Sequence, residues 1–320
     1  MLISVICPIL NEAEHIQSLI DFFINSLPDE KELFLVDGGS TDGTLEIIGK
    51  NQEHHPEIHL LHNAKKVVPY ALNLAIPNCV GKFIVRLDGH SVYSDDYFVK
   101  ILETFARSGA DIVGGPTRTR YKTSLQEAIA FSVTHPLGIG GSRVHDEKYE
   151  GFTDSVTFGA WKREVFEAVG LFDTQLVRNQ DDEFHYRTKS LGFKIYQSPS
   201  IKLYYFPRSS ITSLFKQYFQ YGYYKPLVLR KVKSETKMRH LVPSIFVLYL
   251  LSLIGIHSFL YFIPLILYLL LILSVSFASK KKWLVKLKIL IAIPCVHVAY
   301  GSGFLLGISK LFSKPSKQDV

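Results

Sequence analysis

The stretch FIVRLDGHSVY, residues 83–93, is an apolar run that stops abruptly in an Asp-Gly-His turn. Two earlier runs, LISVICP at 2–8 and ELFLVDGGS at 32–40, also pass from apolar residues into a polar end. Helical patterns such as EAEHIQSLIDFFINSL at 12–27 alternate with these runs. Continuous apolar strands between amphipathic helices predict an α/β fold with a doubly wound, mostly parallel sheet.

Three of the predicted strands end in polar residues that suit ligand binding. In doubly wound sheets the ligand crevice lies beyond the carboxyl ends of the strands. The polar strand ends are Pro8 to Glu12, Asp37 to Asp42, and Asp88 to His90. We therefore expect these three segments to line one crevice.

Asp37 lies in VDGGSTDGT, residues 36–44, a strand end followed by an acidic, glycine-rich turn. The stretch matches neither the GxGxxG dinucleotide fingerprint nor the GxxxxGK[ST] phosphate-binding loop. The Asp37 carboxylate repels a phosphate but can accept hydrogen bonds from a base or a ribose. The alternative is a tight turn in which Thr41 or Asp42 caps the next helix.

Asp88 and His90 lie two residues apart, with a flexible glycine between them. A carboxylate and an imidazole at the end of a strand can both face a divalent cation that bridges substrate phosphates. The alternative is a polar turn before the helix that is predicted to start near Asp95. The spacing by itself favours this alternative.

A third polar cluster is RNQDDEFHYR at 178–187. Adjacent carboxylates at a crevice supply a general base, because repulsion and desolvation raise the pKa of one of them. The alternative for Asp181, Asp182 and Glu183 is favourable negative charge at the start of a helix. The residues alone do not choose between these interpretations.

The last quarter of the chain is apolar. Residues 241–279 contain no Lys, Arg, Asp or Glu. One helix of this length spans about 58 Å, nearly twice the ~30 Å hydrocarbon core, so we expect two crossings with a break near Gly255 to Ser258. Residues 289–309 form a second uncharged run that suits a third span or, given Pro294 and its glycines, a re-entrant or interfacial segment.

Basic residues flank residues 241–279 on both sides, which predicts a cytoplasmic location for both flanks. The first residues carry no signal-peptide pattern, so we expect an inner (plasma) membrane protein with a cytoplasmic first domain. The basic residues beside the membrane segments also account for the net charge of +7. Because no nucleic-acid-binding module is recognised, we expect no nucleic-acid partner. The three cysteines lack metal-site spacing and are expected to be buried, reduced thiols.

Read in order, these clusters resemble glycosyltransferase family 2, whose members have the GT-A nucleotide-sugar fold. The matching motifs are SVICPILNEAEHI, VDGGSTDGT, ALNLAI, VRLDGHSVY, TFGAWKREVFEAVGLFD and NQDDEFHYR. The match covers roughly residues 1–230. The version with Asp-Gly-His, GAWKREVF and QYFQYGYYK looks closest to the succinoglycan-biosynthesis branch, which extends membrane-attached polysaccharide intermediates.

The resemblance implies roles for the crevice residues. It places Pro8, Asn11 and Glu12 along the nucleotide pocket, Asp37 at the uracil or ribose, and Asn73 near the donor. It also places Asp88 and His90 where the family has its Asp-x-Asp metal motif, which implies Mg²⁺ or Mn²⁺. Histidine in the second position tilts the expected preference toward Mn²⁺.

The resemblance also implies the reaction chemistry. It makes Asp181 the general base, with Asp182 as the rival, and puts Glu183 and Arg187 on the family's second acid and arginine. Gln180 stands where the family has Glu, which departs from the pattern. The implied reaction is a single displacement with inversion, so an α-linked sugar nucleotide gives a β-glycoside.

Two further positions concern the acceptor. Trp161, in FGAW at 158–161, either stacks on a sugar or belongs to the core. Gln217 is the first residue of the segment in which processive synthases of the family carry Gln-x-x-Arg-Trp. Gln220 and Tyr221 replace the last two residues of that motif, which argues against a processive polymerase.

The predicted layout is a GT-A catalytic domain at 1–212, an aromatic and basic interfacial segment at 213–240, two to three transmembrane helices within 241–312, and a polar tail at 313–320. The expected function is inverting transfer from a nucleotide sugar, UDP-linked, to a lipid-linked saccharide acceptor in exopolysaccharide or capsule biosynthesis. Other polysaccharide-assembly proteins are possible partners. The alternatives are a polyprenyl-phosphate glycosyltransferase and a non-catalytic nucleotide-sugar-binding subunit of an assembly complex.

Overall fold

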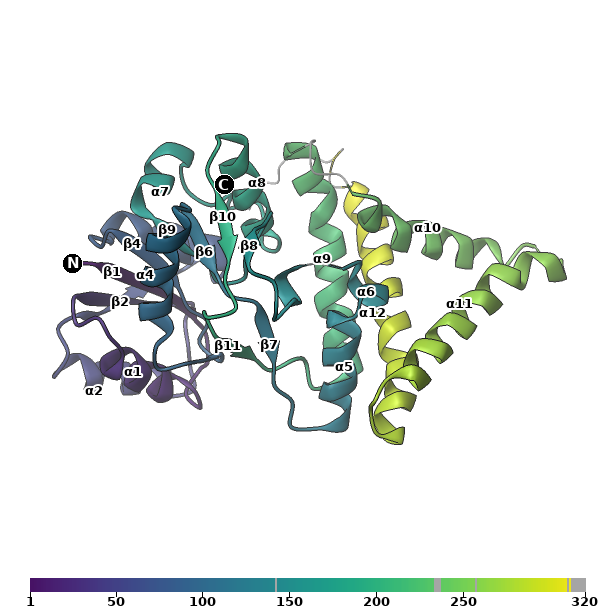
Figure 1. Cartoon of the computed structure of the whole chain (residues 1–320), viewed down its shortest axis with the longest axis horizontal. Coiled ribbons are helices and arrows are strands. Elements are labelled where there is room, and N and C mark those ends of the chain that lie inside the picture. The colour runs from purple at the N-terminus through teal and green to yellow at the C-terminus, as the bar shows by residue number, and fades with distance from the viewer. Residues whose placement is uncertain (142, 233–236, 257, 310, 312–320) are drawn as a thin grey trace. The chain divides into compact units, whose positions relative to one another are not determined.

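Figure 1 shows the computed structural model of the chain, which describes residues 1–141, 143–232, 237–256, 258–309 and 311. The predicted tail at 313–320 lies outside the described residues. The chain divides into two units. The first comprises Met1–Arg118 with Arg143–Tyr205, and the second comprises Thr119–Ser142 with the chain from Phe206 onward.

The first unit is built around a mixed sheet with the order β3-β2-β1-β4-β9-β6-β10-β8. These strands are β1 (Ile3–Ile9), β2 (Lys31–Asp37), β3 (Ile58–His62), β4 (Phe83–Arg86), β6 (Ile112–Gly114), β8 (Gly151–Phe152), β9 (Ala160–Lys162) and β10 (Ile195–Gln197). Strands β1 to β4 pair in parallel, whereas β9 runs antiparallel to β4 and β6. The predicted doubly wound, mostly parallel α/β sheet is confirmed, and the antiparallel insertion of β9 is an addition to it.

Helices cover the sheet, as the alternating sequence pattern predicts (Figure 1). They are α1 (Ile16–Asn25), α2 (Thr44–Gln52), α3 (Val68–Ala75), α4 (Tyr97–Ser108), α7 (Arg163–Val169) and α8 (Gln180–Ser190). A small second sheet has the order β5-β11-β7, formed by β5 (Val92–Tyr93), β11 (Leu203–Tyr205) and β7 (Thr117–Thr119).

Strand β1 is buried on both faces, because alternate residues enter two different cores. Val5 and Cys7 belong to the core that contains residues of α1 and α4, whereas Ile6 belongs to the core that contains residues of α3, α7 and α8. Burial raises the pKa of the Cys7 thiol and raises the pKa of Cys79 to about 12. The expected buried, reduced thiols are confirmed at these two positions, while Cys295 is free but only half-buried.

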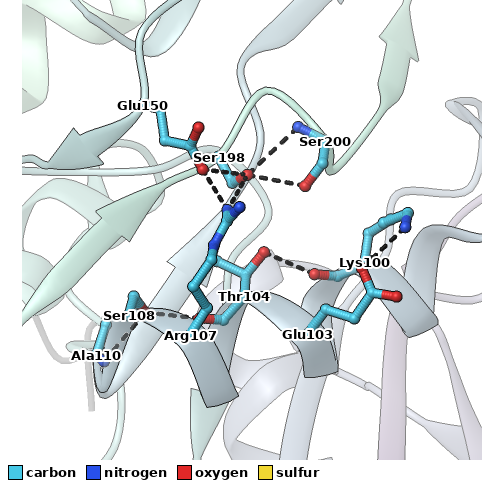
Figure 2. A network of polar contacts seen from close by, with 9 residues as sticks. All are labelled: Lys100, Glu103, Thr104, Arg107, Ser108, Ala110, Glu150, Ser198 and Ser200. Carbon is cyan, nitrogen blue, oxygen red and sulfur yellow. Dashed lines mark hydrogen bonds and ion pairs between the residues drawn. The ribbon is translucent and has the colours of Figure 1, made fainter.

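A polar network holds α4 against the segment that follows β10, as Figure 2 shows. The Arg107 guanidinium of α4 pairs with Glu150 and lies 3.4 Å from the buried Ser198 hydroxyl. The Ser198 hydroxyl in turn lies 2.8 Å from the Ser200 hydroxyl. The network therefore fixes the segment that connects β10 to β11. Strand β11 pairs with β5, the short strand that follows the Asp-Gly-His turn.

The second unit is helical. Its helices are α5 (Ser124–Thr134), α6 (Pro136–Ile139), α9 (Ile211–Lys231), α10 (Met238–Ser252), α11 (Phe259–Ala278) and α12 (Trp283–Ser309). Buried Ala128 of α5 packs in one cluster with Ile289 and Ile293 of α12. The short segment between β7 and β8 therefore folds with the C-terminal helices, which the sequence did not suggest. The functional boundaries at 212, 240 and 312 stay predictions.

Two helices are long and apolar enough to cross a membrane, α11 and α12, among the residues that the structure describes. Helix α10 has 15 residues, or about 22 Å, which is shorter than a ~30 Å hydrocarbon core. The break between α10 and α11 falls where the sequence predicts it. Helix α12 is continuous through Pro294, and the choice between a third span and a re-entrant or interfacial segment stays a prediction.

The glycines of α12 serve close packing between helices. A Cβ atom at Gly303 would lie 2.1 Å from the Phe219 carbonyl oxygen of α9, and one at Gly307 would lie 2.2 Å from that of Tyr223. On the facing helix, a Cβ at Gly222 would lie 2.1 Å from the Tyr300 carbonyl oxygen. Small residues let helix backbones approach closely, which is the usual basis of helix association in membranes.

We expect Gly303→Ala to destabilise the helical unit by about 1–3 kcal/mol, because the added methyl group forces α9 and α12 apart. Thermal unfolding in detergent measures the change. Gly255→Ala is the matched control, since a Cβ there meets nothing within 4 Å. Equal unfolding midpoints for the two variants would show that the close approach does not matter.

Candidate active site

The polar strand ends of β1 and β2 are joined by hydrogen bonds. Because the strands are parallel, Ile9 pairs with Asp37 at the same edge of the sheet. Beyond this pair, the Asn11 amide donates to the Ser40 hydroxyl at 2.8 Å, and the Thr41 amide donates to the Asn11 side-chain oxygen at 2.9 Å. The first two predicted strand ends therefore form one continuous loop surface.

Pro8 and Asp37 lie inside this edge rather than on its surface. Pro8 is half-buried in β1 and pairs with Val36 of β2. The Asp37 side chain accepts hydrogen bonds from the Gly39 amide at 2.7 Å and from the Ser40 amide and hydroxyl at 3.1 and 2.6 Å. Asp37 is only 1% exposed. In this structure it holds its own turn, which is the alternative that the sequence left open.

The Asp-Gly-His turn brings Asp88, His90 and Glu12 into contact. His90 Nδ1 lies 3.0 Å from Glu12 Oε1, and His90 Nε2 lies 3.2 Å from Asp88 Oδ2. A Cβ atom at Gly89 would lie 3.0 Å from the Glu12 carboxyl carbon, so a glycine permits this close approach. The third strand end thus meets the first one through side-chain contacts.

Tyr93 is a support of this turn that the sequence analysis missed. The Asp88 amide donates to the Tyr93 hydroxyl at 2.7 Å, and that hydroxyl donates back to the Asp88 carbonyl oxygen. Burial, followed by the Asp88 charge, raises the pKa of Tyr93, so its hydroxyl stays protonated at neutral pH. The available signal was the short alternating stretch that directly follows the turn.

The donor types at this turn suit a divalent cation, since the His90 imidazole contacts two carboxylates, those of Glu12 and Asp88. Oxygen ligands fit Mg²⁺ and Mn²⁺, and imidazole is better accepted by Mn²⁺. Both His90 nitrogens contact carboxylates in this structure. Within residues 1–141, 143–232, 237–256, 258–309 and 311, no group of three or more His, Cys, Asp or Glu side chains is arranged as a ready metal cage.

Asp181 lies in the first turn of α8 and pairs with a buried arginine that the sequence analysis did not single out. Arg86 Nη1 lies 2.6 and 2.7 Å from the two Asp181 carboxylate oxygens. Asp182 follows in the same turn and is half-buried. The detectable signal was a lone charge inside the apolar strand FIVRL, where a basic residue needs a partner.

Glu183 and Arg187 attach α8 to the chain after α7. The Arg187 side chain binds both Glu183 carboxylate oxygens, at 2.8 and 3.0 Å. It also donates to the carbonyl oxygens of Val169 and Leu171. These two predicted site residues therefore fix the position of the helix that carries Asp181.

Asn73 makes a reciprocal pair with the backbone of Phe172. Its side-chain amide donates to the Phe172 carbonyl oxygen at 2.8 Å, and its side-chain oxygen accepts from the Phe172 amide at 2.9 Å. The side chain was expected near the donor. In this structure it fastens α3 to the loop after α7.

Trp161 belongs to the core, so the expected sugar-stacking surface is not present in this structure. The residue is 2% exposed in β9. Its ring makes edge contacts with Phe166, Phe172 and Phe184, and it stacks on His185. An apolar ring in a central strand is covered by the helices on that face, which sequence spacing does not reveal.

We expect Trp161→Ala to lower the free energy of unfolding by about 3–5 kcal/mol, because it removes a large buried ring. Urea unfolding followed by circular dichroism measures the change. Trp283→Ala is the matched control, because Trp283 is 62% exposed, and we expect an effect of about 0.5 kcal/mol or less. Similar losses for both variants would contradict the core assignment.

His185 is a buried neighbour of the acidic turn. Burial lowers its pKa against the opposing effect of Asp181 and Asp182, so the ring is neutral at pH 7. Its Nδ1 lies 2.9 Å from the Ser155 hydroxyl. As an uncharged ring of α8, His185 therefore attaches this helix to Ser155 and to the Trp161 ring of β9.

Non-glycine residues with positive φ angles lie beside each part of this edge. Asn11 (φ 55°) follows β1, Phe158 (φ 45°) precedes β9, and Asn179 (φ 62°) precedes α8. Lys66 (φ 58°) lies beside the turn of Asp37, with its ammonium 3.4 Å from where a Gly39 Cβ would be. Backbone strain of this kind concentrates at functional sites.

Gln217 lies in α9 of the second unit. Its side-chain amide donates to the Tyr221 hydroxyl at 3.1 Å, one helical turn further on. The contact is local to α9. The acceptor-side role expected for Gln217 therefore stays a prediction.

The α/β sheet thus carries Asp37 and Asp88 at the ends of its parallel strands, and Arg86 of β4 pairs with Asp181 at the acidic start of α8, an arrangement that suits an enzyme active site. The chain belongs to glycosyl transferase family 2, because the model of that family matches residues 4–170. The predicted family and enzyme class are confirmed: the protein is a glycosyltransferase.

Two curated relatives match most of the chain. The succinoglycan biosynthesis protein ExoA of Rhizobium meliloti is 32% identical over 242 residues, which cover 75% of this chain and 73% of the relative. The dolichyl N-acetyl-α-D-glucosaminyl phosphate 3-β-D-2,3-diacetamido-2,3-dideoxy-β-D-glucuronosyltransferase of Methanococcus voltae is 32% identical over 271 residues, covering 81% and 84%. The predicted resemblance to the succinoglycan-biosynthesis branch is confirmed.

Solved structures share the fold. A mannosyltransferase from Pyrobaculum calidifontis, in complex with GDP-mannose and Mn²⁺, has a TM-score of 0.55 at 18% identity and covers 97% of this chain and 74% of its own. S. aureus TarS 1–349 has a TM-score of 0.52 at 13% identity, with coverage of 94% and 91%. At these identities the likeness establishes the fold.

Proposed function

We propose that the protein is an inverting, membrane-associated glycosyltransferase that moves a sugar from a nucleotide sugar, UDP-linked, to a lipid-linked saccharide. Its first unit carries out the transfer, and the product is an intermediate of exopolysaccharide or capsule biosynthesis. The names of the two curated relatives support this assignment, since they specify succinoglycan biosynthesis and transfer to a dolichyl-linked sugar phosphate.

One observation carries the proposal: the end of strand β4 lies next to both the predicted base and the predicted diphosphate site. Asp181 pairs with Arg86, and Asp88 follows Arg86 by two residues. Two residues of extended chain span about 6.6 Å, so the predicted base and the residue predicted to lie at the diphosphate are close together at the end of β4. A single in-line displacement needs an acceptor base and a leaving group at such a short separation.

Asp88, with His90 and Glu12 in contact, would hold a divalent cation at the donor diphosphate. When bound, the cation supplies positive charge that stabilises the departing nucleoside diphosphate. Asn11, Ser40 and Thr41 form the loop surface beside it that suits the nucleotide, with Asp37 bracing the turn underneath. The GDP-mannose and Mn²⁺ complex of a fold relative supports this arrangement.

Asp181 accepts the proton of the acceptor hydroxyl. The freed oxygen attacks the anomeric carbon from the face opposite the diphosphate, and the bond from that carbon to the diphosphate oxygen breaks. The configuration at the anomeric carbon inverts, so an α-linked donor gives a β-glycoside. Neutral His185 and the Glu183–Arg187 pair keep α8 in place while the proton moves.

The helical unit provides the membrane attachment in this proposal. Helices α11 and α12 are the candidate spans, and α11 exposes most of its apolar side chains. The basic residues before α10 and the lysines between α11 and α12 suit the cytoplasmic face of an inner membrane. This location gives the first unit access to cytoplasmic nucleotide sugars and to a membrane-bound acceptor.

A donor screen tests the proposal. The full-length protein in detergent is incubated with Mn²⁺ or Mg²⁺ and a series of UDP-, GDP- and dTDP-sugars, and release of the nucleoside diphosphate is measured. We expect metal-dependent release from one UDP-sugar that increases when membrane lipid extract is added. No release from any donor in the presence of the extract would contradict the proposal.

A further inference from the structure

The buried guanidinium of Arg86 pairs with a partly exposed carboxylate, that of Asp181. Its side chain is 8% exposed, whereas that of Asp181 is 30% exposed. The guanidinium therefore anchors the carboxylate from inside the sheet and leaves it partly accessible to solvent. The two residues are 95 positions apart in sequence, so only the fold brings them together.

Residues just before β9 contact the side chain and the backbone of Arg86. The Phe158 ring lies 5.2 Å from the guanidinium carbon, in a cation–π contact, and Phe158 has a strained φ of 45°. The Arg86 amide donates to the Gly159 carbonyl oxygen at 3.1 Å. Arg86 is thus held at its backbone and on one ring face, which restricts the directions in which it can present its nitrogens.

Stability alone does not explain this arrangement. Burying a guanidinium costs several kcal/mol of desolvation, and an apolar side chain of similar volume often stabilises such a position equally well or better. Arg86 Nε is moreover buried without a hydrogen-bond partner among the described residues, which adds to that cost. The compensating benefit lies in what the cation does to Asp181.

We infer that Arg86 is a positioning residue that fixes the Asp181 carboxylate over the carboxyl end of β4. The inference rests on the proposed function, and it adds a residue that sets the geometry of the proposed active site. Arg86 is the last residue of β4 and Asp88 follows it by two residues, so the end of this strand sets the distance between the proton acceptor and the diphosphate. Without the guanidinium, Asp181 is free to turn toward solvent from the first turn of α8.

A double-mutant cycle tests the inference, with Arg86→Met, Asp181→Asn and their combination. We expect Arg86→Met to lower kcat about 10²-fold, the size of effect that misplacement of a reacting group produces. The KM for the donor should change by less than about 3-fold, since the nucleotide surface is untouched. In the Asp181→Asn background the same Arg86→Met change should alter kcat by less than about 3-fold.

Arg187→Met is the matched comparison. Arg187 is also a cation that pairs with a carboxylate of α8 and lies over an aromatic ring, that of Phe184, but it belongs to α8 itself and its partner is Glu183. Any loss that it causes should multiply with that of Asp181→Asn. If Arg86→Met gives the same factor in both backgrounds, or acts only through the KM for the donor, Arg86 is not a positioning residue.

Arg86→Lys covers the case in which Arg86→Met does not fold. Lysine keeps the charge but loses the planar fork, so we expect a kcat between those of the wild type and Arg86→Met, again without effect in the Asp181→Asn background. A lysine effect that persists in that background would overturn the inference. Absence of wild-type turnover with any donor would instead overturn the proposed function, and the positioning role with it.

Discussion

Asp181→Asn is expected to lower the rate of sugar transfer about 10³-fold, the largest effect of any single substitution in this protein. The amide keeps the size of the side chain and can still accept a hydrogen bond from Arg86, but it cannot take a proton from the acceptor. The affinity for the nucleoside diphosphate should stay within about 3-fold, because Asp181 does not touch the nucleotide loops. Steady-state transfer kinetics and calorimetric titration with UDP measure the two quantities.

Asp182→Asn is the matched control for this prediction, since Asp182 is the next residue in the same turn of α8. We expect it to retain more than about a tenth of the wild-type rate, because the carboxylate that we propose as the base is Asp181, which pairs with Arg86. A large loss for Asp182→Asn together with a small one for Asp181→Asn would assign the base to Asp182. Thermal unfolding of both variants checks that neither loss reflects unfolding.

Asp88→Ala is expected to lower turnover at least about 10²-fold and to abolish the Mn²⁺ dependence of UDP binding. The substitution removes one of the two carboxylates in contact with His90 and leaves the cation without its main oxygen ligand. Titration of UDP with and without Mn²⁺ measures the effect directly. In the wild type we expect the metal to tighten binding, and in Asp88→Ala we expect equal affinities under both conditions.

Asp95→Ala provides the control for this second prediction. Asp95 is exposed and lies shortly before α4. It carries the same charge as Asp88 and lies in the same region of the chain, but it is not one of the predicted cation ligands. We expect wild-type turnover and an unchanged effect of Mn²⁺. If Asp88→Ala binds UDP with the metal dependence of the wild type, Asp88 does not hold the cation.

The features that the sequence predicted are local ones. The strands β1, β2 and β4 and the start of α8 follow from runs of neighbouring residues, and parallel strands carry their carboxyl ends to a common edge by geometry alone. The order of the motifs then identified the family. No long-range contact was needed for any of these steps.

The features that the sequence did not predict depend on contacts between distant segments. Strand β9 inserts antiparallel between β4 and β6, and this insertion buries Trp161 and brings Phe158 beneath Arg86. Asn73 of α3 meets Phe172 across 99 positions and fastens the helix to the loop after α7, while its expected place near the donor stays a prediction. Sequence spacing carries no information on such pairings, whereas the charge of Arg86 in an apolar strand was a usable sign.

The stereochemistry of the product tests the central claim most directly. The wild-type protein is supplied with Mn²⁺, the α-linked UDP-sugar found in the donor screen and a lipid-linked saccharide, and the anomeric configuration of the new linkage is read from its proton coupling constant. A β-linkage is the result that a single displacement with Asp181 as base predicts. An α-linkage would contradict that mechanism, because retention requires a different arrangement of groups around the anomeric carbon.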